Sequence, residues 1–247
     1  MTRVKICGIT RVEDAALAIE LGASALGFNF YQASPRYIAP EAAREIIRHA
    51  VPPLVMAVGV FADEADAKRV IAVARESGVS AIQLHGPRLP VGATLVPALS
   101  LATLAVAQGG AGTRPAPTSG ENHHWPYPVI QAVAVDNKFE PESLQDLAQD
   151  QGGVIMLDAY HPVLKGGTGQ TIDWAKAREA TKYVRVILAG GLTPENVGEA
   201  IRQVRPFAVD VASGVVAAPG VKDAPKLRAF FNAVREADEM IQSTKGG

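Results

Sequence analysis

The chain has 247 residues, 48% of them apolar, and a formal net charge of −1 at pH 7. This composition is sufficient for a large core and excludes a chain that is disordered throughout, while the balanced charge gives no indication of a nucleic-acid or membrane partner. The single cysteine excludes an internal disulfide, and Met1 is followed directly by a strand-like run with no room for a signal peptide, so we expect a cytoplasmic protein.

Eight short apolar runs predict β-strands, and segments that mix apolar with charged positions, typical of amphipathic helices, lie between them. Alternating strands and helices in a chain of this length favour one domain over residues 1–247, a single (β/α)8 TIM barrel. The alternative is an open doubly wound sheet, but no GxGxxG pattern follows the first run. The runs begin near Val4, Ala25, Leu54, Ala81, Val129, Gly153, Val184 and Ala208.

Capping patterns predict where several helices begin. Thr10-Arg11-Val12-Glu13 has the capping-box pattern and opens a helix that ends at Gly22. Thr193 offers an N-cap before Pro194, a residue that favours the first helical position, and Asp223 caps the last helix. The remaining helices are expected at residues 40–50, 63–77 and 140–151, and the last one at 224–241.

The interval before the run at Val129 is much longer than the other intervals. Residues 108–126 are rich in glycine and proline, which predicts an irregular surface insertion. The fifth strand is then Val129–Val135, because Asp136 and a helical segment follow it directly. The alternative is Thr94–Leu99, which would place the insertion after the strand.

Residues 89–113 carry no charged side chain and therefore need to be considered as a membrane span. Proline and glycine interrupt the segment, and its densest apolar part is shorter than the ~20 residues that a span needs. We expect no membrane partner, and we interpret residues 89–107 as a helix that is partly buried or used in self-association. His123 and His124 lie in the insertion without further ligand spacing, so no metal site is predicted.

The first and sixth strands each end in a candidate catalytic residue. Alternation places Lys5 and Cys7 on the same face, and a barrel would bring Cys7 to the C-terminal rim, where active sites form. A thiol acts as a base when nearby cations favour the thiolate; the alternative is a small buried hydrophobe. Asp158 ends an inward column of the sixth strand and could face Cys7 as an acid, or else cap a helix or pair with Lys165.

Three glycine- or serine-rich turns follow strands in the second half of the chain, and they favour phosphate binding through backbone N–H groups. Arg36, after the second strand, presents a planar fork that binds a carboxylate or a phosphate. His85 and Asp210 end the fourth and eighth strands, and a barrel would place them at the same mouth. The turns are Gly166-Gly167-Thr168-Gly169, Ala189-Gly190-Gly191 and Ser213-Gly214, in which Gly167, Thr168, Gly169, Gly190, Gly191, Ser213 and Gly214 are the predicted phosphate-binding residues.

Short stretches in one order along the chain carry a family resemblance. They include Val4-Lys5-Ile6-Cys7-Gly8-Ile9-Thr10, Ser34-Pro35-Arg36-Tyr37-Ile38, Gly59-Val60-Phe61, Gln83-Leu84-His85-Gly86, Leu157-Asp158, Gly166–Gly169 with Asp173-Trp174, Ala189-Gly190-Gly191-Leu192-Thr193-Pro194-Glu195-Asn196-Val197 and Val209-Asp210-Val211-Ala212-Ser213-Gly214-Val215. Together they resemble the phosphoribosylanthranilate isomerase family of tryptophan biosynthesis, from residue 4 to about 223 except about 87–128.

The resemblance implies a cytoplasmic isomerase that works without metal or cofactor on a small phosphorylated substrate. The reaction would be the Amadori rearrangement of N-(5-phospho-β-D-ribosyl)anthranilate to 1-(2-carboxyphenylamino)-1-deoxy-D-ribulose 5-phosphate. Asp158 would be the general acid and Cys7 the general base. Arg36 would bind the anthranilate carboxylate, Asp210 and His85 would contact the substrate, and the glycine and serine turns would bind its phosphate.

The chain departs from the family at two places: Val216 stands in place of the usual glutamate after Ser-Gly-Val, and the insertion at residues 108–126 is atypical. The related histidine-pathway isomerase is an alternative, but its resemblance calls for aspartate where Cys7 stands and for a second phosphate site. A second alternative is a non-catalytic phosphate-binding barrel, against which the joint presence of Cys7, Arg36 and Asp158 argues. We expect a monomer or a weak homo-oligomer.

Overall fold

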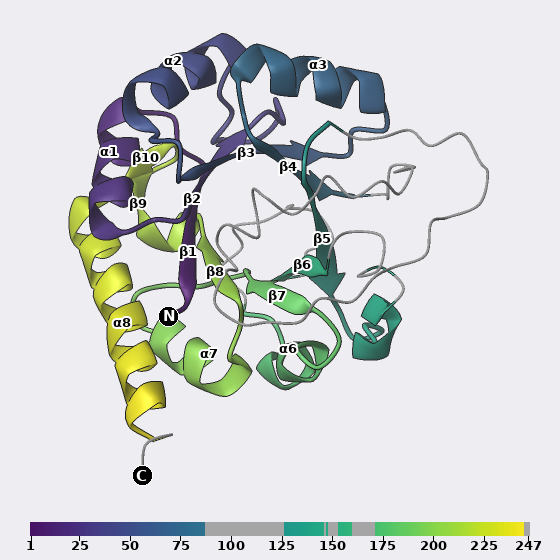
Figure 1. Ribbon diagram of the computed structural model, residues 1–247, viewed down its shortest axis with the longest axis vertical. Helices are drawn as coiled ribbons and strands as arrows, with labels where there is room; N and C mark the ends of the chain where they lie inside the picture. Colours follow the sequence, from purple (N-terminus) through teal and green to yellow (C-terminus); the bar gives the residue numbers. More distant parts are fainter. Residues whose placement is uncertain (87–125, 146, 148–152, 160–170, 245–247) are drawn as a thin grey trace.

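The computed structural model describes residues 1–86, 126–145, 147, 153–159 and 171–244. Within these ranges eight parallel strands pair in chain order, and β8 pairs with β1, so that the sheet closes into a barrel. Figure 1 shows the strands as a ring with the helices outside it. The predicted (β/α)8 barrel is therefore confirmed, and the open sheet is excluded. The strands are β1 Arg3–Cys7, β2 Ala25–Asn29, β3 Met56–Ala62, β4 Ala81–His85, β5 Val129–Val135, β6 Val154–Ala159, β7 Arg185–Leu188 and β8 Ala208–Val211.

Helices and short elements connect these strands. The α-helices are α1 Val12–Leu21, α2 Pro40–Ala50, α3 Ala67–Ser77, α6 Trp174–Ala180, α7 Val197–Val204 and α8 Ala224–Ser243. The 3-10 turns are η1 Pro141–Ser143 and η2 Ser213–Val215, and a small antiparallel hairpin consists of β9 Val216–Ala218 and β10 Val221–Lys222.

Alternation along the strands produces two separate apolar clusters. One contains Val58 and Met156 and no helical residue, so it fills the inside of the barrel. The other contains Val4 and Ile6 together with helical residues such as Phe230, so it lies between strands and helices. The side chains that alternate with Val4 and Ile6 on β1 consequently point inward, as the sequence predicts.

Several predicted boundaries are wrong. The helix expected after Thr10 begins at Val12 without a side-chain cap, because the Thr10 hydroxyl donates instead to the carbonyl oxygen of Gly220. The helix expected at Pro194 begins at Val197, since residues 194–196 form a turn closed by the Asn196 side chain on the Thr193 N–H. The third strand begins at Met56 rather than near Leu54, and α3 begins at Ala67, after the Asp66 cap.

Other predictions hold or fall outside the described residues. Val129–Val135 is the fifth strand of the ring, and Asp223 caps α8 by accepting from the Lys226 N–H. Of the helix expected at 140–151, the structure shows the turn Pro141–Ser143, while residues 146 and 148–152 are outside the described part. Most of the predicted insertion, Thr94–Leu99, residues 89–107, His123 and His124 also lie outside it. No helix within the described ranges is long and apolar enough to cross a membrane.

Candidate active site

A pocket of about 410 Å³ lies at the C-terminal ends of the barrel strands. Active sites of this fold form at that end, because eight strand–helix loops converge there. Most of the residues singled out from the sequence line this one pocket, although they come from strands and loops distant in the chain. They are Cys7, Arg36, His85, Asp158, Gly190, Gly191, Asp210 and Ser213.

Asp158 occupies the end of β6 with 15% of its side chain exposed. One carboxylate oxygen, Oδ1, accepts a hydrogen bond of 2.8 Å from the Ala159 N–H. Burial raises the pKa of the Asp158 carboxyl to about 6, and the nearby Asp210 carboxylate adds to this shift, while the Ala159 N–H, Lys5 and Arg36 oppose it. A carboxyl with a pKa this close to neutrality can donate a proton under physiological conditions.

Cys7 ends β1 and is buried at the floor of the pocket. Burial raises the pKa of its thiol, which Asp210 reinforces, whereas the cationic groups of Lys5, Lys222 and Arg36 act in the opposite direction. The thiol of Cys7 is thus surrounded by three cations that stabilise its thiolate whenever it forms.

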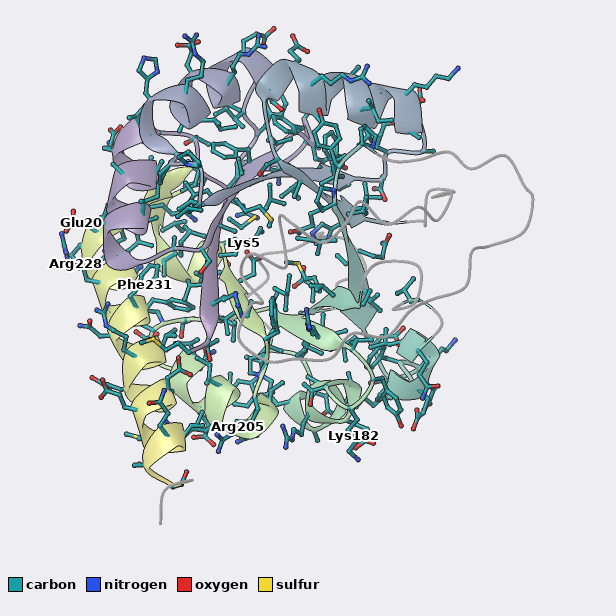
Figure 2. The ribbon with its side chains drawn as sticks, in the orientation of Figure 1. Lys5, Glu20, Lys182, Arg205, Arg228 and Phe231 are labelled. Carbon is teal, nitrogen blue, oxygen red and sulfur yellow. The ribbon has the colours of Figure 1, made fainter. Side chains whose placement is uncertain are left out.

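Beneath Cys7, the ammonium of Lys5 pairs with the Asp210 carboxylate of β8 at 2.7 Å. Both side chains are almost fully buried, and Figure 2 places Lys5 within the ring of strands. Burial disfavours the charge on Lys5, but the Asp210 carboxylate and Cys7 outweigh it, so that the pKa of Lys5 is raised. Asp210 therefore pairs with a lysine in addition to lining the pocket, a contact that the sequence did not predict.

His85 ends β4 and lies next to Asp158. Its Nδ1 is 4.0 Å from Oδ2 of Asp158, and its Nε2 is 2.6 Å from Nε2 of the buried Gln83. With the Gln83 amide nitrogen as donor, His85 Nε2 accepts and the ring proton lies on Nδ1, toward Asp158; the opposite orientation of the Gln83 amide exchanges these roles. The sequence analysis did not predict this contact of Gln83. The position of Gln83 two residues before His85, on the same face of β4, would have indicated it.

Arg36 lies half-buried in the loop after β2, which the Asn29 side chain holds by donating to the Ser34 hydroxyl. A Cβ on Gly8 would lie 2.5 Å from Cδ of Arg36, and Gly8 has a φ of +78°. The turn after β1 thus needs glycine both for its backbone conformation and to leave room for the arginine.

Two of the three predicted phosphate-binding turns are described. Gly190 and Gly191 follow β7 with φ values of +81° and +64°. A Cβ on Gly190 would lie 2.6 Å from the Ala159 nitrogen, and one on Gly214 would collide with the Leu192 carbonyl oxygen. Gly214 itself does not line the pocket, whereas Ser213 does. Gly167, Thr168 and Gly169 lie outside the described residues.

Lys222 is the buried functional candidate that the sequence analysis missed. It lies on β10, and its Nζ donates to the carbonyl oxygen of Cys7 at 2.6 Å and to that of Ala212 at 3.0 Å. Backbone carbonyls 215 and 10 residues away give no side-chain pattern in a sequence, so this contact had no available signal. Across the parts of the chain that the structure describes, no group of three His, Cys, Asp or Glu residues is arranged to hold a metal ion.

Comparison with known proteins identifies a single family. A family model described as N-(5'phosphoribosyl)anthranilate (PRA) isomerase matches residues 4–102 and 121–233. The N-(5'-phosphoribosyl)anthranilate isomerase of Trichlorobacter lovleyi is 44% identical over 238 residues, which cover 96% of this chain and 100% of that protein. The enzyme of the same name from Geobacter sp. strain M21 is 43% identical, with 93% of this chain and 96% of that protein covered.

Solved structures agree with these relatives. Phosphoribosyl anthranilate isomerase from Thermotoga maritima superposes with a TM-score of 0.73 at 38% identity, covering 96% of this chain and 100% of that one. The Thermus thermophilus enzyme gives a TM-score of 0.72 at 39% identity, covering 95% and 99%. A further phosphoribosyl anthranilate isomerase structure is a complex with reduced 1-(o-carboxyphenylamino)-1-deoxyribulose 5-phosphate. It superposes with a TM-score of 0.69 at 36% identity, covering 96% of this chain and 100% of that one.

Proposed function

The chain belongs to the N-(5'-phosphoribosyl)anthranilate isomerase family, an isomerase family of tryptophan biosynthesis, and on this premise we propose how its pocket carries out the rearrangement. One observation carries the proposal: a single pocket collects a carboxyl with a near-neutral pKa, a thiol, a guanidinium and two glycine-containing turns. An aldose-to-ketose rearrangement needs an acid, a base and an anchor for each end of an open-chain sugar, and this set provides all four.

In the proposed reaction the Asp158 carboxyl donates its proton to the furanose ring oxygen. The bond between that oxygen and C1 breaks, and the nitrogen lone pair forms a C1=N double bond. The Cys7 thiolate then removes the C2 proton, the electron pair of that C–H bond forms the C1=C2 bond of an enolamine, and the C1=N π pair returns to the nitrogen. Tautomerisation moves a proton from the C2 hydroxyl oxygen to C1 and gives the ketone, so that no external oxidant or reductant is required. Proton exchange with solvent then returns Cys7 to the thiolate and Asp158 to the carboxyl form.

The remaining pocket residues orient the substrate. Arg36 forms a bidentate pair with the anthranilate carboxylate, and backbone N–H groups at Gly190, Gly191, Ser213 and Gly214 bind the phosphate, together with Gly167, Thr168 and Gly169. His85, with its Nδ1 near Asp158, and Asp210, at the pocket floor, contact the sugar between these anchors. Fixing both ends keeps the ring oxygen and C2 in reach of the acid and the base.

The test is the loss of anthranilate fluorescence when freshly made phosphoribosylanthranilate is turned over. Wild type, Cys7→Ser and Asp158→Asn are compared, with Asp136→Asn as a matched control, since Asp136 lies outside this pocket. We expect both pocket variants to lose activity by a factor of about 10² or more, the usual size of general acid–base contributions, and the control to retain it. Full activity in either pocket variant would contradict the role assigned to that residue.

Three statements about the whole protein are proposals as well. Residues 1–247 form one domain, the protein is cytoplasmic, and it is a monomer or a weak homo-oligomer. The closure of β1 onto β8 supports the first, because the two ends of the described barrel depend on each other. Sedimentation at increasing concentration tests the third, and a tight oligomer at low concentration would contradict it.

A further inference from the structure

Lys222 connects three parts of the molecule around the floor of the pocket. Its backbone N–H donates to the buried Asp14 carboxylate of α1 at 3.0 Å. Its Nζ donates at 2.6 Å to the carbonyl of Cys7, the last residue of β1, and at 3.0 Å to that of Ala212, which directly precedes the Ser213 turn. One side chain thus fixes the main chain of the proposed base relative to a proposed phosphate-binding turn.

Among the described residues, the ammonium of Lys222 has hydrogen-bond acceptors but no carboxylate partner. The side chain is buried, with a relative exposure of 5%, and no described carboxylate lies within ion-pair distance of Nζ. In the β9–β10 hairpin the residue directly opposite is Val216, which is apolar. An unpaired buried cation is costly, so its retention beside Cys7 calls for an anion that is formed or bound there.

The charged groups around Cys7 come from four separate segments of the chain. Lys5 of β1 and Asp210 of β8 lie on the barrel side, Arg36 comes from the loop after β2, and Lys222 comes from β10. Lys222 in turn interacts with Cys7, Arg36, Asp210 and Asp14. Lys5 is already paired with Asp210, whereas the Lys222 ammonium is a buried cation near Cys7 that makes no direct contact with a carboxylate of the described residues.

We propose that Lys222 is a positioning residue for the proposed general base: its hydrogen bonds hold the Cys7 main chain against the Ser213 turn, and its charge favours the Cys7 thiolate. This inference rests on the proposed function, since it gives the thiolate a use. Burial lowers the pKa of Lys222 to about 8, reinforced by Arg36 and opposed by Cys7, Asp210 and Asp14. The ammonium therefore remains mostly protonated at neutral pH.

The test uses Cys7 as its own reporter, because it is the only cysteine in the chain. The rate of alkylation by iodoacetamide, followed by mass spectrometry from pH 6 to 10, gives the apparent pKa of the thiol. Lys222→Met removes the charge and the donors, Lys222→Arg keeps both, and Lys176→Met is the matched control. Among the described residues, the Lys176 ammonium also donates to backbone carbonyls alone, those of Asp136, Asn137 and Phe139, but away from Cys7.

At pH 7, where the Lys222 ammonium is present, we expect Lys222→Met to lower the alkylation rate of Cys7 about tenfold, which corresponds to about one pKa unit of thiolate stabilisation, with wild-type rates at that pH in Lys222→Arg and Lys176→Met. The kcat of Lys222→Met should fall at neutral pH and recover partly as the pH rises, which a purely structural defect would not do. A folded Lys222→Met variant with an unchanged alkylation rate at pH 7 would overturn the proposal. The alkylation measurement needs no turnover, so it is independent of whether the proposed function holds.

A second measurement applies if Lys222→Met does not fold. The charge of Lys222 is lost above its pKa of about 8, whereas the charge of an arginine persists. The alkylation rate of Cys7 is therefore compared between wild type and Lys222→Arg at pH 7 and at pH 9. Equal rates at pH 7 with a higher rate for Lys222→Arg at pH 9 support the proposal, and equal rates at both pH values would overturn it.

Discussion

Asp158 and Cys7 are both buried, and burial raises the pKa of both groups. In the free protein the Asp158 carboxyl ionises near pH 6, while the Cys7 thiol remains protonated to higher pH. The proposed reaction needs the opposite pair, a protonated Asp158 and a Cys7 thiolate. The productive form is therefore a protonation state with a small population. This population depends on the cations Lys5, Lys222 and Arg36, which stabilise the thiolate.

This arrangement predicts a bell-shaped dependence of kcat/KM on pH. Below about pH 6 Asp158 is protonated, and activity rises with pH because the thiolate fraction rises. Between the two pKa values the falling fraction of protonated Asp158 and the rising fraction of thiolate cancel, and above the thiol pKa activity falls. Stopped-flow fluorescence across pH 5–10 measures this profile. An acid limb well above pH 7 in the free enzyme would contradict the raised Asp158 pKa as its origin.

Asp158→Asn is expected to stabilise the protein at neutral pH while it abolishes activity. The folded-state pKa of about 6 exceeds the ordinary 3.8, so the folded protein holds this proton more tightly. Stability from this group is full below about pH 4 and is lost as the pH rises through 6, at about 1.4 kcal/mol per unit of pKa difference. Asparagine does not ionise, so the variant should be more stable by about 1–3 kcal/mol at pH 7.

Urea unfolding of wild type and Asp158→Asn at pH 4 and pH 7 measures this difference. The two proteins should have similar unfolding free energies at pH 4 and should separate at pH 7. A constant difference at both values would show that the substitution acts through packing instead of through the charge.

At the scale of the elements, the turn after β7 depends on a glycine for two separate reasons. Gly190 has a φ of +81°, and an added Cβ would lie 2.6 Å from the Ala159 nitrogen. Gly78, at the end of α3, has a φ of +73° with nothing within 4 Å of an added Cβ. Alanine at Gly78 therefore incurs the left-handed strain alone, whereas alanine at Gly190 also displaces β6 next to Asp158.

We expect Gly78→Ala to cost about 1 kcal/mol of stability without change in KM or kcat. Gly190→Ala should cost more, about 2–3 kcal/mol, and should weaken the binding of inorganic phosphate as a competitive inhibitor. Thermal unfolding and inhibition by phosphate measure the two effects. Equal behaviour of the two variants would mean that the close approach to Ala159 is not what the turn requires.

Sequence patterns identify the strands of this fold better than its helix starts. Alternation is a property of each strand, so the inward positions of Lys5 and Cys7 follow from β1 alone. Helix caps depend on what else competes for a side chain: the Thr10 hydroxyl binds Gly220, more than 200 residues away in the chain. The same limit hides Lys222, since its acceptors are main-chain carbonyls that only the closed barrel brings to it.

At the scale of the whole molecule, closing the barrel also builds the pocket floor. β1 carries Lys5 and Cys7, β8 carries Asp210, and Lys5 is directly opposite Asp210 in the register of the two strands. The ion pair at 2.7 Å therefore joins the first strand to the last while it sets the charge around Cys7. The Lys5–Asp210 ion pair therefore contributes both to the stability of the barrel and to the electrostatics of the site.

Lys5→Met leaves a buried carboxylate without its partner, which typically costs about 3–5 kcal/mol. The double variant Lys5→Met/Asp210→Leu removes both charges, so it should be destabilised by less than the sum of the single variants. Lys182→Met is the matched control, because Lys182 pairs with Glu179 at the same 2.7 Å but in solvent, at the outer rim in Figure 2. Its unfolding midpoint should hardly change.

Urea unfolding of these variants, analysed as a double-mutant cycle, separates the pair from its surroundings. A large favourable coupling between positions 5 and 210, together with a small effect at Lys182, would show that burial gives the pair its weight in barrel closure. If the changes in unfolding free energy of the two single variants simply add up in the double variant, the backbone pairing of β1 with β8 closes the ring without help from the ion pair. In that case the buried pair would be retained for its charge beneath Cys7, and Lys5→Met would raise the thiol pKa without much loss of stability.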